Sequence, residues 1–445
     1  MRKLFGTDGI RGVAGEYPLD RRTVYAVGRA LGHHLPSGVR RLVIGQDTRE
    51  SSAWITDLLS AGLRDTGAQV ESAGVITTPG IAHLTHTHNF SAGVVISASH
   101  NPWQDNGIKI FGPDGYKLPD RTELEIEEEI FTQLNSSATA PEMCDTSSLP
   151  GNATLRDDYA SWLARSISSG GPIKTVVDCA NGAASNLAPQ VFRQCGISAD
   201  FIHNSPNGRN INEKCGALHP EVVAGEVASR KTDLGISLDG DADRALFADH
   251  GGKVVNGDAI MLLLARELEQ HGHLANNLVV ATTMSNMGLE AALSRSGIQM
   301  LRAPVGDKYV LEEMKKSGAV LGGEQSGHII LSELATTGDG LLTALKVIEI
   351  MARTGKPLTE LVSDLKVFPQ IIKNVRVLEK RPLDQIPAVQ SAIDAAQRDL
   401  DGTGRVVVRY SGTEALARVM IEAESRAKME LHATAIAEAI QRALG

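Results

Sequence analysis

Short apolar runs rich in Val and Ile alternate with helical patterns of about 12 residues along most of this sequence. One helical pattern, Arg22–Leu35, precedes the apolar run Arg41–Gly45, and a second, Ala53–Thr66, precedes the run Gly74–Ile76. Strands that alternate with helices of this length predict a layered α/β fold with a mostly parallel sheet. Because ligands bind at the carboxyl ends of the strands in such sheets, the residues after each apolar run are the first candidates for a functional site.

The same alternation restarts twice and then gives way to another pattern. A polar segment with Ser and Pro, residues 134–152, is typical of a connection between domains. The last part of the chain combines three strand patterns with two helices instead. The expected fold class is therefore three similar α/β domains with mixed sheets and a C-terminal α+β domain, over residues 1–152, 153–252, 253–366 and 367–445.

The later elements follow from the same patterns. In the second and third domains we expect strands at Thr175–Asp178, Leu234–Leu238 and Leu278–Thr282, a hairpin near His250, and a helix at Gly340–Thr354. In the last domain we expect strands at Val375–Leu378, Arg405–Arg409 and Ala417–Ala423, with helices at Leu383–Leu400 and at the C-terminus.

Charge and composition exclude several classes of partner. The 445 residues include 44 Lys and Arg against 53 Asp and Glu, a net charge of −9, which argues against a nucleic acid partner. No run of about 18 apolar residues is present and the N-terminus lacks the apolar core of a signal peptide, so we expect a cytoplasmic protein without a membrane partner. The cysteines fit neither a CxxC pair nor a zinc spacing, and we expect reduced thiols at Cys144, Cys179, Cys195 and Cys215.

The stretch Gly93–Pro102 is the first candidate for catalytic chemistry. An apolar run stops abruptly there at Ser-Ala-Ser-His-Asn-Pro, which places both serines on a loop at the carboxyl end of a strand. A hydroxyl there, followed by His100 and later by Lys109, suits a nucleophile with a base and a charged partner. The pattern does not separate Ser97 from Ser99, and a hydrogen-bonded Asx/Ser turn without chemistry is the alternative.

Three carboxylates form the second candidate site. Asp239, Asp241 and Asp243 occupy alternate positions directly after an apolar run, and in a curled loop such side chains converge on one side. Three hard oxygen ligands suit Mg²⁺. A calcium EF-hand loop is excluded, because its sixth and twelfth positions would here be Arg244 and His250. A solvated acidic turn remains the alternative, although three carboxylates repel one another without a cation.

The segment Gly322–His328 concentrates polar groups between glycines. The carboxylate of Glu324, the hydroxyl of Ser326 and the neighbouring amide suit neighbouring sugar hydroxyls, which both donate and accept hydrogen bonds. His328 could titrate near neutrality and transfer a proton. A polar surface turn is the alternative for this segment.

A phosphate-binding set follows the apolar run in the last domain. It combines the guanidinium groups of Arg409 and Arg418 with the hydroxyls of Ser411 and Thr413 and the backbone N–H groups around Gly412. A solvated hairpin turn is the alternative.

A glycine-rich loop near the N-terminus is a weaker signal. Residues Gly6–Gly12 place three glycines around Asp8 and Arg11, so that the backbone could approach an anion. Glycine loops this short occur in many unrelated proteins.

Taken together, these motifs resemble the α-D-phosphohexomutase family over almost the whole chain. The resemblance is carried by Ser97–Pro102, Asp239–Arg244, Gly323–His328 and Arg409–Glu414, which occur in the family's order. The opening Phe5–Gly12 and the motif Gly-Glu-Gln-Ser-Gly-His at Gly323–His328 look most like the bacterial branch that acts on glucosamine phosphates.

The chain departs from the family's pattern at two positions beside the motifs. Ala415 stands where a proline usually follows, and Ser52 stands where glycine is frequent. We expect altered loop stiffness there rather than lost function.

The resemblance implies the four-domain phosphohexomutase architecture and a role for each motif. Ser99 matches the family's phosphorylated serine, and one of its phosphate oxygens would join Asp239, Asp241 and Asp243 in holding Mg²⁺. Arg11, Lys109 and His328 match positions near the transferred phosphate or in acid/base roles. The sugar loop matches Glu324 to His328, with Ser326, and the distal phosphate cradle matches Arg409, Ser411, Gly412 and Thr413. His100, Arg244 and Arg418 are added from their chemistry.

The expected activity is an isomerase reaction between glucosamine 6-phosphate and glucosamine 1-phosphate. It would pass through phospho-Ser99 and an enzyme-bound 1,6-bisphosphate and would feed UDP-N-acetylglucosamine and cell-wall precursor synthesis. The expected partners are sugar phosphates, a sugar 1,6-bisphosphate activator, a kinase or bisphosphate that phosphorylates Ser99, and a second copy in a homodimer. The alternatives are a phosphomannomutase/phosphoglucomutase of the same family and, more distantly, a non-catalytic sugar-phosphate sensor.

Overall fold

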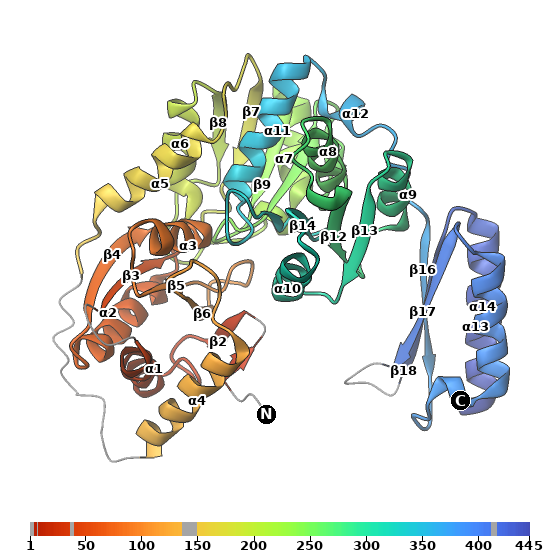
Figure 1. The fold of residues 1–445 in the computed structure, drawn as a ribbon, viewed down its shortest axis with the longest axis horizontal. Helices are drawn as coiled ribbons and strands as arrows, with labels where there is room; N and C mark the ends of the chain where they lie inside the picture. The colour runs from red at the N-terminus through yellow and green to blue at the C-terminus, as the bar shows by residue number, and fades with distance from the viewer. Residues whose placement is uncertain (1–3, 7, 36–39, 136–148, 411–415) are drawn as a thin grey trace. The chain divides into compact units, whose positions relative to one another are not determined.

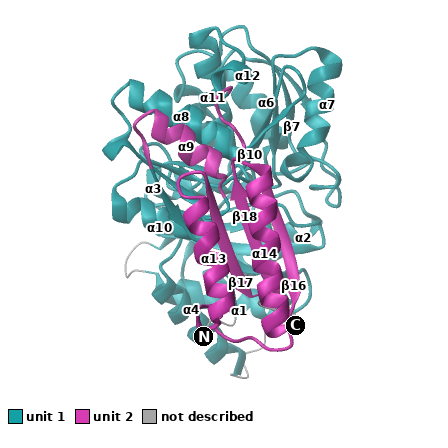
Figure 2. Cartoon of the chain, turned by 90° about the vertical axis from the view of Figure 1, so that its right-hand side faces the viewer, with its two compact units in different colours: residues 1–284, 300–362 teal, residues 285–299, 363–445 magenta. Residues whose placement is uncertain are grey.

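The chain folds into two compact units, which are described separately. The computed structural model describes residues 4–6, 8–35, 40–135, 149–410 and 416–445. The first unit comprises residues 1–284 and 300–362, and the second comprises residues 285–299 and 363–445 (Figure 2). Among the described residues, no helix combines the length and the apolar character needed to cross a membrane. Cys179, Cys195 and Cys215 are free thiols, and Cys144 lies outside the described residues.

The first sheet of the first unit is mixed. Its six strands lie in the order β1-β2-β6-β5-β3-β4 (Figure 1) and are β1 (Phe5–Gly6), β2 (Gly9–Val13), β3 (Arg41–Gln46), β4 (Gln69–Val75), β5 (Ala92–Ile96) and β6 (Asp105–Phe111). Strand β3 pairs in parallel with β4 and β5, whereas β6 runs antiparallel to β5 and β2. The mostly parallel sheet suggested by the alternation alone is thus confirmed only for its half around β3, and the mixed sheet of the expected fold class is confirmed.

Strand β6 has no counterpart among the elements expected from sequence. Its first residues, Asp105–Gly107, carry an Asn-Gly pair, which is a common turn signal. Here the Asn106 amide is instead buried and donates to the hydroxyls of Ser51 (2.8 Å) and Ser52 (3.0 Å). The Gly107 carbonyl accepts the N–H of Ser97 (3.0 Å), so tertiary contacts hold these residues extended.

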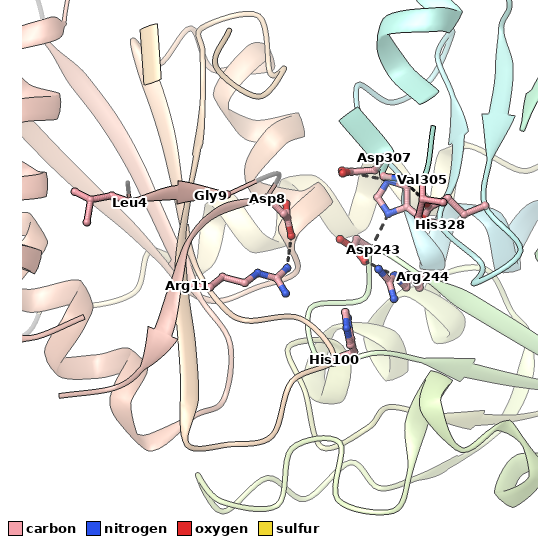
Figure 3. Close-up of a pocket in the computed structure, with 13 residues that line it drawn as sticks. Leu4, Asp8, Gly9, Arg11, His100, Asp243, Arg244, Val305, Asp307 and His328 are labelled. Carbon is pink, nitrogen blue, oxygen red and sulfur yellow. Dashed lines mark hydrogen bonds and ion pairs between the residues drawn. The ribbon is translucent and has the colours of Figure 1, made fainter. Parts of the chain in front are cut away.

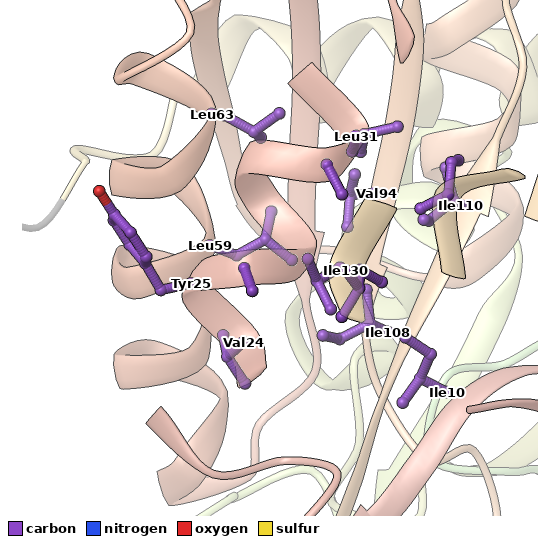
Figure 4. Packing of buried hydrophobic residues seen from close by; sticks show 14 of the residues in the cluster. Ile10, Val24, Tyr25, Leu31, Leu59, Leu63, Val94, Ile108, Ile110 and Ile130 are labelled. Atoms are coloured by element: carbon purple, nitrogen blue, oxygen red, sulfur yellow. The ribbon is translucent and has the colours of Figure 1, made fainter. Parts of the chain in front are cut away.

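Four helices accompany this sheet, α1 (Arg21–His34), α2 (Glu50–Arg64), α3 (Thr78–Thr87) and α4 (Asp120–Asn135). Helix α1 begins where the Asp20 side chain accepts the N–H groups of Arg22 and Thr23. Residues from α1, α2, α4 and the sheet form one apolar cluster, which includes Leu31, Leu59, Val94, Ile108 and Ile130 (Figure 4). This buried cluster fixes β5 and β6, and therefore the loop that joins them.

The second sheet has five strands in the order β11-β10-β9-β7-β8. They are β7 (Lys174–Asp178), β8 (Ser198–Ile202), β9 (Leu234–Leu238), β10 (Ala245–Asp249) and β11 (Val254–Val255), with helices α5 (Ala153–Arg165), α6 (Ala184–Gln194) and α7 (Pro220–Arg230). Strand β9 is buried along its whole length and covers the expected residues, and β10 and β11 form the expected hairpin around His250.

The third sheet has four strands in the order β13-β12-β14-β15. They are β12 (Leu278–Thr282), β13 (Gln299–Ala303), β14 (Leu321–Gly323) and β15 (Ile329–Leu331), with helices α8 (Gly257–Gln270), α10 (Asp307–Ser317), α11 (Gly340–Thr354) and the short α12 (Leu358–Leu361). Strand β12 and helix α11 have the expected bounds.

The second unit contains α9 (Met287–Arg295) and an antiparallel sheet with the strand order β16-β18-β17. The strands are β16 (Gln370–Arg376), β17 (Gly404–Tyr410) and β18 (Leu416–Ala423), and two helices, α13 (Pro387–Asp399) and α14 (Arg426–Leu444), accompany them. Strand β16 starts earlier than expected and ends before Leu378, because its ladder with β18 runs from Gln370 to Arg376 and leaves Leu378 88% exposed. The α+β composition of this part is confirmed.

Helices α1 and α2 cross where two glycines face each other. A Cβ atom on Gly28 would lie 2.2 Å from the Leu59 carbonyl oxygen, and one on Gly62 would lie 2.3 Å from the Tyr25 carbonyl oxygen. Both neighbours are backbone atoms, so the two helices would have to separate to admit even a methyl group.

We therefore expect Gly28→Ala to lower the free energy of unfolding by about 1–3 kcal/mol, because the helices must move apart. The measurement is the urea midpoint followed by circular dichroism. Gly225→Ala is the matched control, since Gly225 lies within α7 and a Cβ there meets nothing within 4 Å; it should be neutral or stabilising by up to about 1 kcal/mol. Equal midpoints for the two variants would contradict the close packing.

Candidate active site

Loops at the carboxyl ends of three strands converge in the first unit. They follow β5 (residues 97–104), β9 (residues 239–244) and β14 (residues 324–328), and the N-terminal loop before β2 joins them. Figure 3 shows the result as a cavity with side chains from separate loops pointing into it. The position of these loops agrees with the general location of sites in α/β sheets.

The Ser99 hydroxyl points at the carboxylate cluster. Its Oγ donates a hydrogen bond to Asp239 Oδ2 at 2.6 Å and lies 3.3 Å from His100 Nδ1. Ser99 adopts a left-handed conformation (φ 53°), which is uncommon for a residue with a Cβ. Ser97 differs, because its Oγ accepts the Ser99 N–H (3.0 Å) within a fully buried site. The structure thus separates the two serines, which the sequence pattern left equivalent.

Side chains from elsewhere hold the backbone of this loop. The buried guanidinium group of Arg49 forms an ion pair with Asp47 and donates to the carbonyl groups of Ser99 (3.2 Å) and Asn101 (2.6 Å). The amide of Asn212 donates to the same two carbonyl groups at 2.9 and 3.0 Å. These contacts explain how the strained conformation of Ser99 is maintained.

Ser52 extends this support. Its Oγ donates to Asp47 Oδ1 at 2.8 Å and accepts the Asn106 amide at 3.0 Å, so the hydroxyl that replaces the family's frequent glycine is completely hydrogen-bonded. The second departure, Ala415, lies outside the described residues.

The three aspartates after β9 converge as their spacing predicts. One oxygen of each of Asp239, Asp241 and Asp243 lies within 4.8 Å of the others, and all three residues are buried. The curl needs a left-handed residue at Ala242 (φ 54°) and a glycine at 240, where a Cβ would lie 2.5 Å from the Ser99 carbonyl oxygen.

A buried ammonium group compensates part of this negative charge. Lys109, 1% exposed, lies 2.9 Å from Asp241, 3.0 Å from Asp8 and 3.6 Å from Asp243. Burial would lower the pKa of Lys109, but these carboxylates outweigh burial and raise its pKa well above the ordinary value. The lysine is therefore a permanent cation.

The aspartates are unequally charged. Burial, followed by the repulsion of Asp243 and Asp241, raises the pKa of Asp239 to about 8. Burial also raises the pKa of Asp243. The positive charges of Lys109, His328 and Arg244 outweigh burial and hold the pKa of this carboxyl far below its usual range. In the metal-free protein Asp239 therefore carries the proton near neutrality, while Asp243 is ionised.

The same cluster fits a divalent cation. Asp241 Oδ1 is buried and, among the described residues, has no hydrogen-bond partner, and the same is true of Asp243 Oδ1. Three carboxylate oxygens within 4.8 Å of one another are hard oxygen donors of the kind that Mg²⁺ prefers.

The cavity beside this cluster has a volume of about 360 Å³. Its polar lining comes from Asp8, Arg11, His100, Asp243, Arg244, Asp307, Glu324 and His328. Asp8 and Arg11 lie on one side, and Asp243, Arg244, Asp307 and His328 lie on the other (Figure 3). The cavity is large enough for a hexose phosphate and carries cationic groups for its phosphate.

Two histidines contact this cavity from different loops. Burial, together with the Arg244 and Arg11 cations, lowers the pKa of His100. Burial also lowers the pKa of His328, but the carboxylates of Asp243, Asp307 and Glu324 together outweigh burial and raise it. The N–H of Gly338 donates to His328 Nε2 at 3.1 Å and opposes protonation of that atom. In the neutral ring this bond places the proton on Nδ1, which lies 3.6 Å from Asp243 Oδ1.

The sugar-loop residues are held by short local contacts. Glu324 Oε1 accepts the N–H of Gly306 at 3.0 Å, and its Oε2 accepts the hydroxyl of Ser326 at 3.2 Å. Ser326 itself is exposed. Arg244 donates its backbone N–H to Asp239 at 3.3 Å, and nearby carboxylates, opposing burial, raise its pKa.

The expected residues of the last domain belong to the second unit. Arg409 and Arg418 lie directly opposite each other on the antiparallel strands β17 and β18. Ser411, Gly412 and Thr413 lie outside the described residues.

Several contributors to the site were not expected from sequence. Arg49, Thr78, Lys117, Asn212 and Asp307 all contact site loops, for example through the Thr78 hydroxyl, which donates to Asp241 at 2.5 Å. Arg49 and Thr78 follow β3 and β4 closely, so the rule that sites lie at strand ends could have found them. Lys117, Asn212 and Asp307 carry no comparable signal.

The fold agrees with that of a known family along most of the chain. Domains I, II and III of the phosphoglucomutase/phosphomannomutase alpha/beta/alpha type match residues 2–137, 157–252 and 256–368, and the C-terminal domain of this type matches residues 372–439. The chain therefore belongs to the phosphoglucomutase/phosphomannomutase family.

Two relatives of high sequence identity are named phosphoglucosamine mutase. The chain is 62% identical to the phosphoglucosamine mutase of Koribacter versatilis, covering 100% of this chain and 98% of the relative. It is 52% identical to the phosphoglucosamine mutase of Solibacter usitatus, covering 100% and 99%. A crystal structure of a phosphoglucomutase/phosphomannomutase family protein from Burkholderia thailandensis has the same fold, with a TM-score of 0.79 and 22% identity. The match covers 98% of this chain and 97% of that protein.

Cation binding at the aspartates should depend on pH. Because the pKa of Asp239 is raised to about 8, binding below that pH must displace a proton, and Mg²⁺ affinity should fall about tenfold for each pH unit below it. Above about pH 8 the affinity should level off. Isothermal titration with Mg²⁺ from about pH 6 to pH 9 measures this slope.

Asp239→Asn is the control for this titration, since it cannot ionise and should bind weakly with a shallower pH dependence. A wild-type affinity that does not change with pH would contradict the assignment.

Proposed function

We propose that this protein interconverts glucosamine 6-phosphate and glucosamine 1-phosphate, with phospho-Ser99 as the phosphoryl donor. The observation that carries the phosphoryl transfer is the Ser99 hydroxyl, held 2.6 Å from a carboxylate of a buried three-aspartate cluster. The amino sugar is supported by relatives named phosphoglucosamine mutase that cover the full chain at 62% and 52% identity.

The reaction would proceed in two transfers at one serine. The P–O bond of phospho-Ser99 breaks as the phosphoryl group passes to the free sugar hydroxyl. The proton of that hydroxyl leaves to a base, and the released Ser99 oxygen takes up a proton. The resulting 1,6-bisphosphate then reorients within the site, and its other phosphoryl group passes to the Ser99 hydroxyl. Such transfers depend on positioning and on compensation of charge rather than on covalent chemistry by the protein.

The residues around Ser99 are suited to charge compensation. Mg²⁺ bound to the three aspartates would neutralise charge on the transferred phosphoryl group. Lys109, Arg11 and Arg244 add permanent positive charge beside it. The Arg49 and Asn212 contacts hold the Ser99 backbone, so that the hydroxyl keeps its direction through both transfers.

The acid/base residue would be His100 or His328. Both line the cavity, His100 3.3 Å from the Ser99 hydroxyl and His328 beside Asp243. The Glu324 and Ser326 pair would bind neighbouring sugar hydroxyls, since carboxylate and hydroxyl together can accept and donate hydrogen bonds.

The distal phosphate would bind to the second unit. Arg409 and Arg418 lie directly opposite each other on β17 and β18, so their guanidinium groups could bind one phosphate together. Ser411, Gly412 and Thr413 would complete this cradle. We divide the chain into domains 1–152, 153–252, 253–366 and 367–445. In this order they would supply the catalytic serine, the cation-binding aspartates, the sugar-binding loop and the phosphate cradle.

Several finer points belong to the same proposal. A sugar 1,6-bisphosphate would act as activator by restoring phospho-Ser99 when the intermediate escapes, and a kinase is the other source of this phosphate. The product would supply UDP-N-acetylglucosamine and cell-wall precursor synthesis. The cytoplasmic location and the homodimer remain predictions.

The first test compares kcat/KM for glucosamine 1-phosphate, glucose 1-phosphate and mannose 1-phosphate, with Mg²⁺ and a bisphosphate. We expect a preference of about a hundredfold or more for the amino sugar, equivalent to about 2.7 kcal/mol of transition-state discrimination. Equal or faster turnover of the neutral sugars would favour a phosphomannomutase/phosphoglucomutase. Absence of turnover on all three would favour a sugar-phosphate sensor.

Ser99→Ala should lower kcat by at least about a thousandfold, because the phosphoryl acceptor is lost while the fold remains. Incubation with a bisphosphate labelled on phosphorus should transfer no label to this variant. Ser97→Ala is the matched control, since it removes a neighbouring hydroxyl and leaves Ser99 in place, and it should still take up label. Full turnover by Ser99→Ala would contradict the phosphoenzyme.

A further inference from the structure

The cavity that would take a sugar phosphate has an unexpectedly acidic lining. Four carboxyl groups, those of Asp8, Asp243, Asp307 and Glu324, lie along its wall. A phosphate dianion is repelled by carboxylates, so each of them needs a partner or a function of its own.

Three of the four are accounted for by protein contacts or by the cation site. Asp8 forms ion pairs with Arg11, Lys117 and Lys109 and uses both of its oxygens. Both oxygens of Glu324 accept hydrogen bonds, from Gly306 and Ser326. Asp243 belongs to the aspartate cluster described above.

Asp307 is the remaining carboxylate. It begins helix α10, and its Oδ2 forms an ion pair with Lys117 and lies 3.8 Å from His328 Nε2. Lys117 is shared with Asp8, so one ammonium group serves two carboxylates. Within the part of the chain that the structure describes, the hydrogen bond of the Asp307 carboxylate uses Oδ2, and Oδ1 has none. Its side chain is 17% exposed and points toward the cavity (Figure 3).

Asp307 is also held next to the sugar loop. The N–H of Gly306, the preceding residue, donates to Glu324 Oε1 at 3.0 Å. The Glu324 carboxylate is therefore hydrogen-bonded to the residue that precedes Asp307. Both carboxyl groups line the same cavity, so a sugar bound by Glu324 would lie near Asp307.

We propose that Asp307 recognises the protonated 2-amino group of the glucosamine phosphate. This inference rests on the proposed function and deepens it, because it names the residue that separates an amino sugar from a neutral hexose. An ammonium group offers three N–H donors and a positive charge, which match a carboxylate oxygen without a protein partner. A hydroxyl at the same carbon gives a weaker, neutral hydrogen bond and brings no positive charge to Asp307.

The test is the ratio of kcat/KM for glucosamine 1-phosphate to that for glucose 1-phosphate, measured on wild type and Asp307→Asn. The variant keeps the shape of the side chain and removes its charge. We expect the ratio to fall about tenfold or more, because the loss of activity on glucosamine 1-phosphate exceeds the loss on glucose 1-phosphate. Activity on glucose 1-phosphate also shows that the variant is folded.

Two further variants sharpen this test. Asp307→Glu keeps the charge and should retain more of the preference than Asp307→Asn. Glu312→Gln removes the same charge from an exposed position of the same helix, so its ratio should equal that of wild type.

The possible failures are distinguishable. A wild-type kcat/KM for glucose 1-phosphate equal to that for glucosamine 1-phosphate would overturn the proposed function and this inference with it. A wild-type preference that Asp307→Asn retains would overturn the inference alone. An equal loss on both substrates would also overturn it, since Asp307 would then support the site without reading the amino group.

Discussion

The buried ammonium group of Lys109 is the interaction on which the site depends. It lies between Asp8, Asp241 and Asp243, which come from two loops far apart in the sequence, and it extends from a strand of the first sheet. Burying these charges is costly, and only their mutual compensation makes the arrangement stable. Removing Lys109 would take away the ammonium group that three carboxylates share, so the same contact that joins the loops also sets the charge of the site.

Main-chain hydrogen bonds between the loops fix the rest of the geometry. The N–H groups of Ala245, Gly257 and Gly340 donate to the carbonyl groups of Gly327, Gln325 and Ala242 at 3.0–3.1 Å. These backbones approach too closely for side chains, since a Cβ on Gly257 would lie 2.1 Å from the Glu324 carbonyl oxygen. The loops at residues 239–244 and 324–328 are therefore positioned by rigid backbone contacts. Phosphoryl transfer depends on such positioning more than on reactive side chains.

The distribution of charge connects the fold to the proposed chemistry. The site brings together carboxylates, cationic groups and two histidines. In the proposed reaction they would serve a divalent cation, a phosphate and proton transfer. A family whose members act on different hexose phosphates can retain this core. Discrimination among sugars would then fall to residues at the cavity wall, such as Asp307, that take no part in the transfer itself.

Much of this protein could be predicted from the sequence by itself. Local periodicity determined the strands at Leu234–Leu238 and Leu278–Thr282, and the alternate spacing of Asp239, Asp241 and Asp243 was sufficient to predict their convergence, because both depend only on near neighbours along the chain. Only the tertiary structure decided that Ser99 rather than Ser97 faces the aspartates, that Asp105–Phe111 is a strand, and that Lys117 and Asp307 meet. Those features depend on which strands pair and which loops touch, and contacts between distant segments leave no periodic signal in a single sequence.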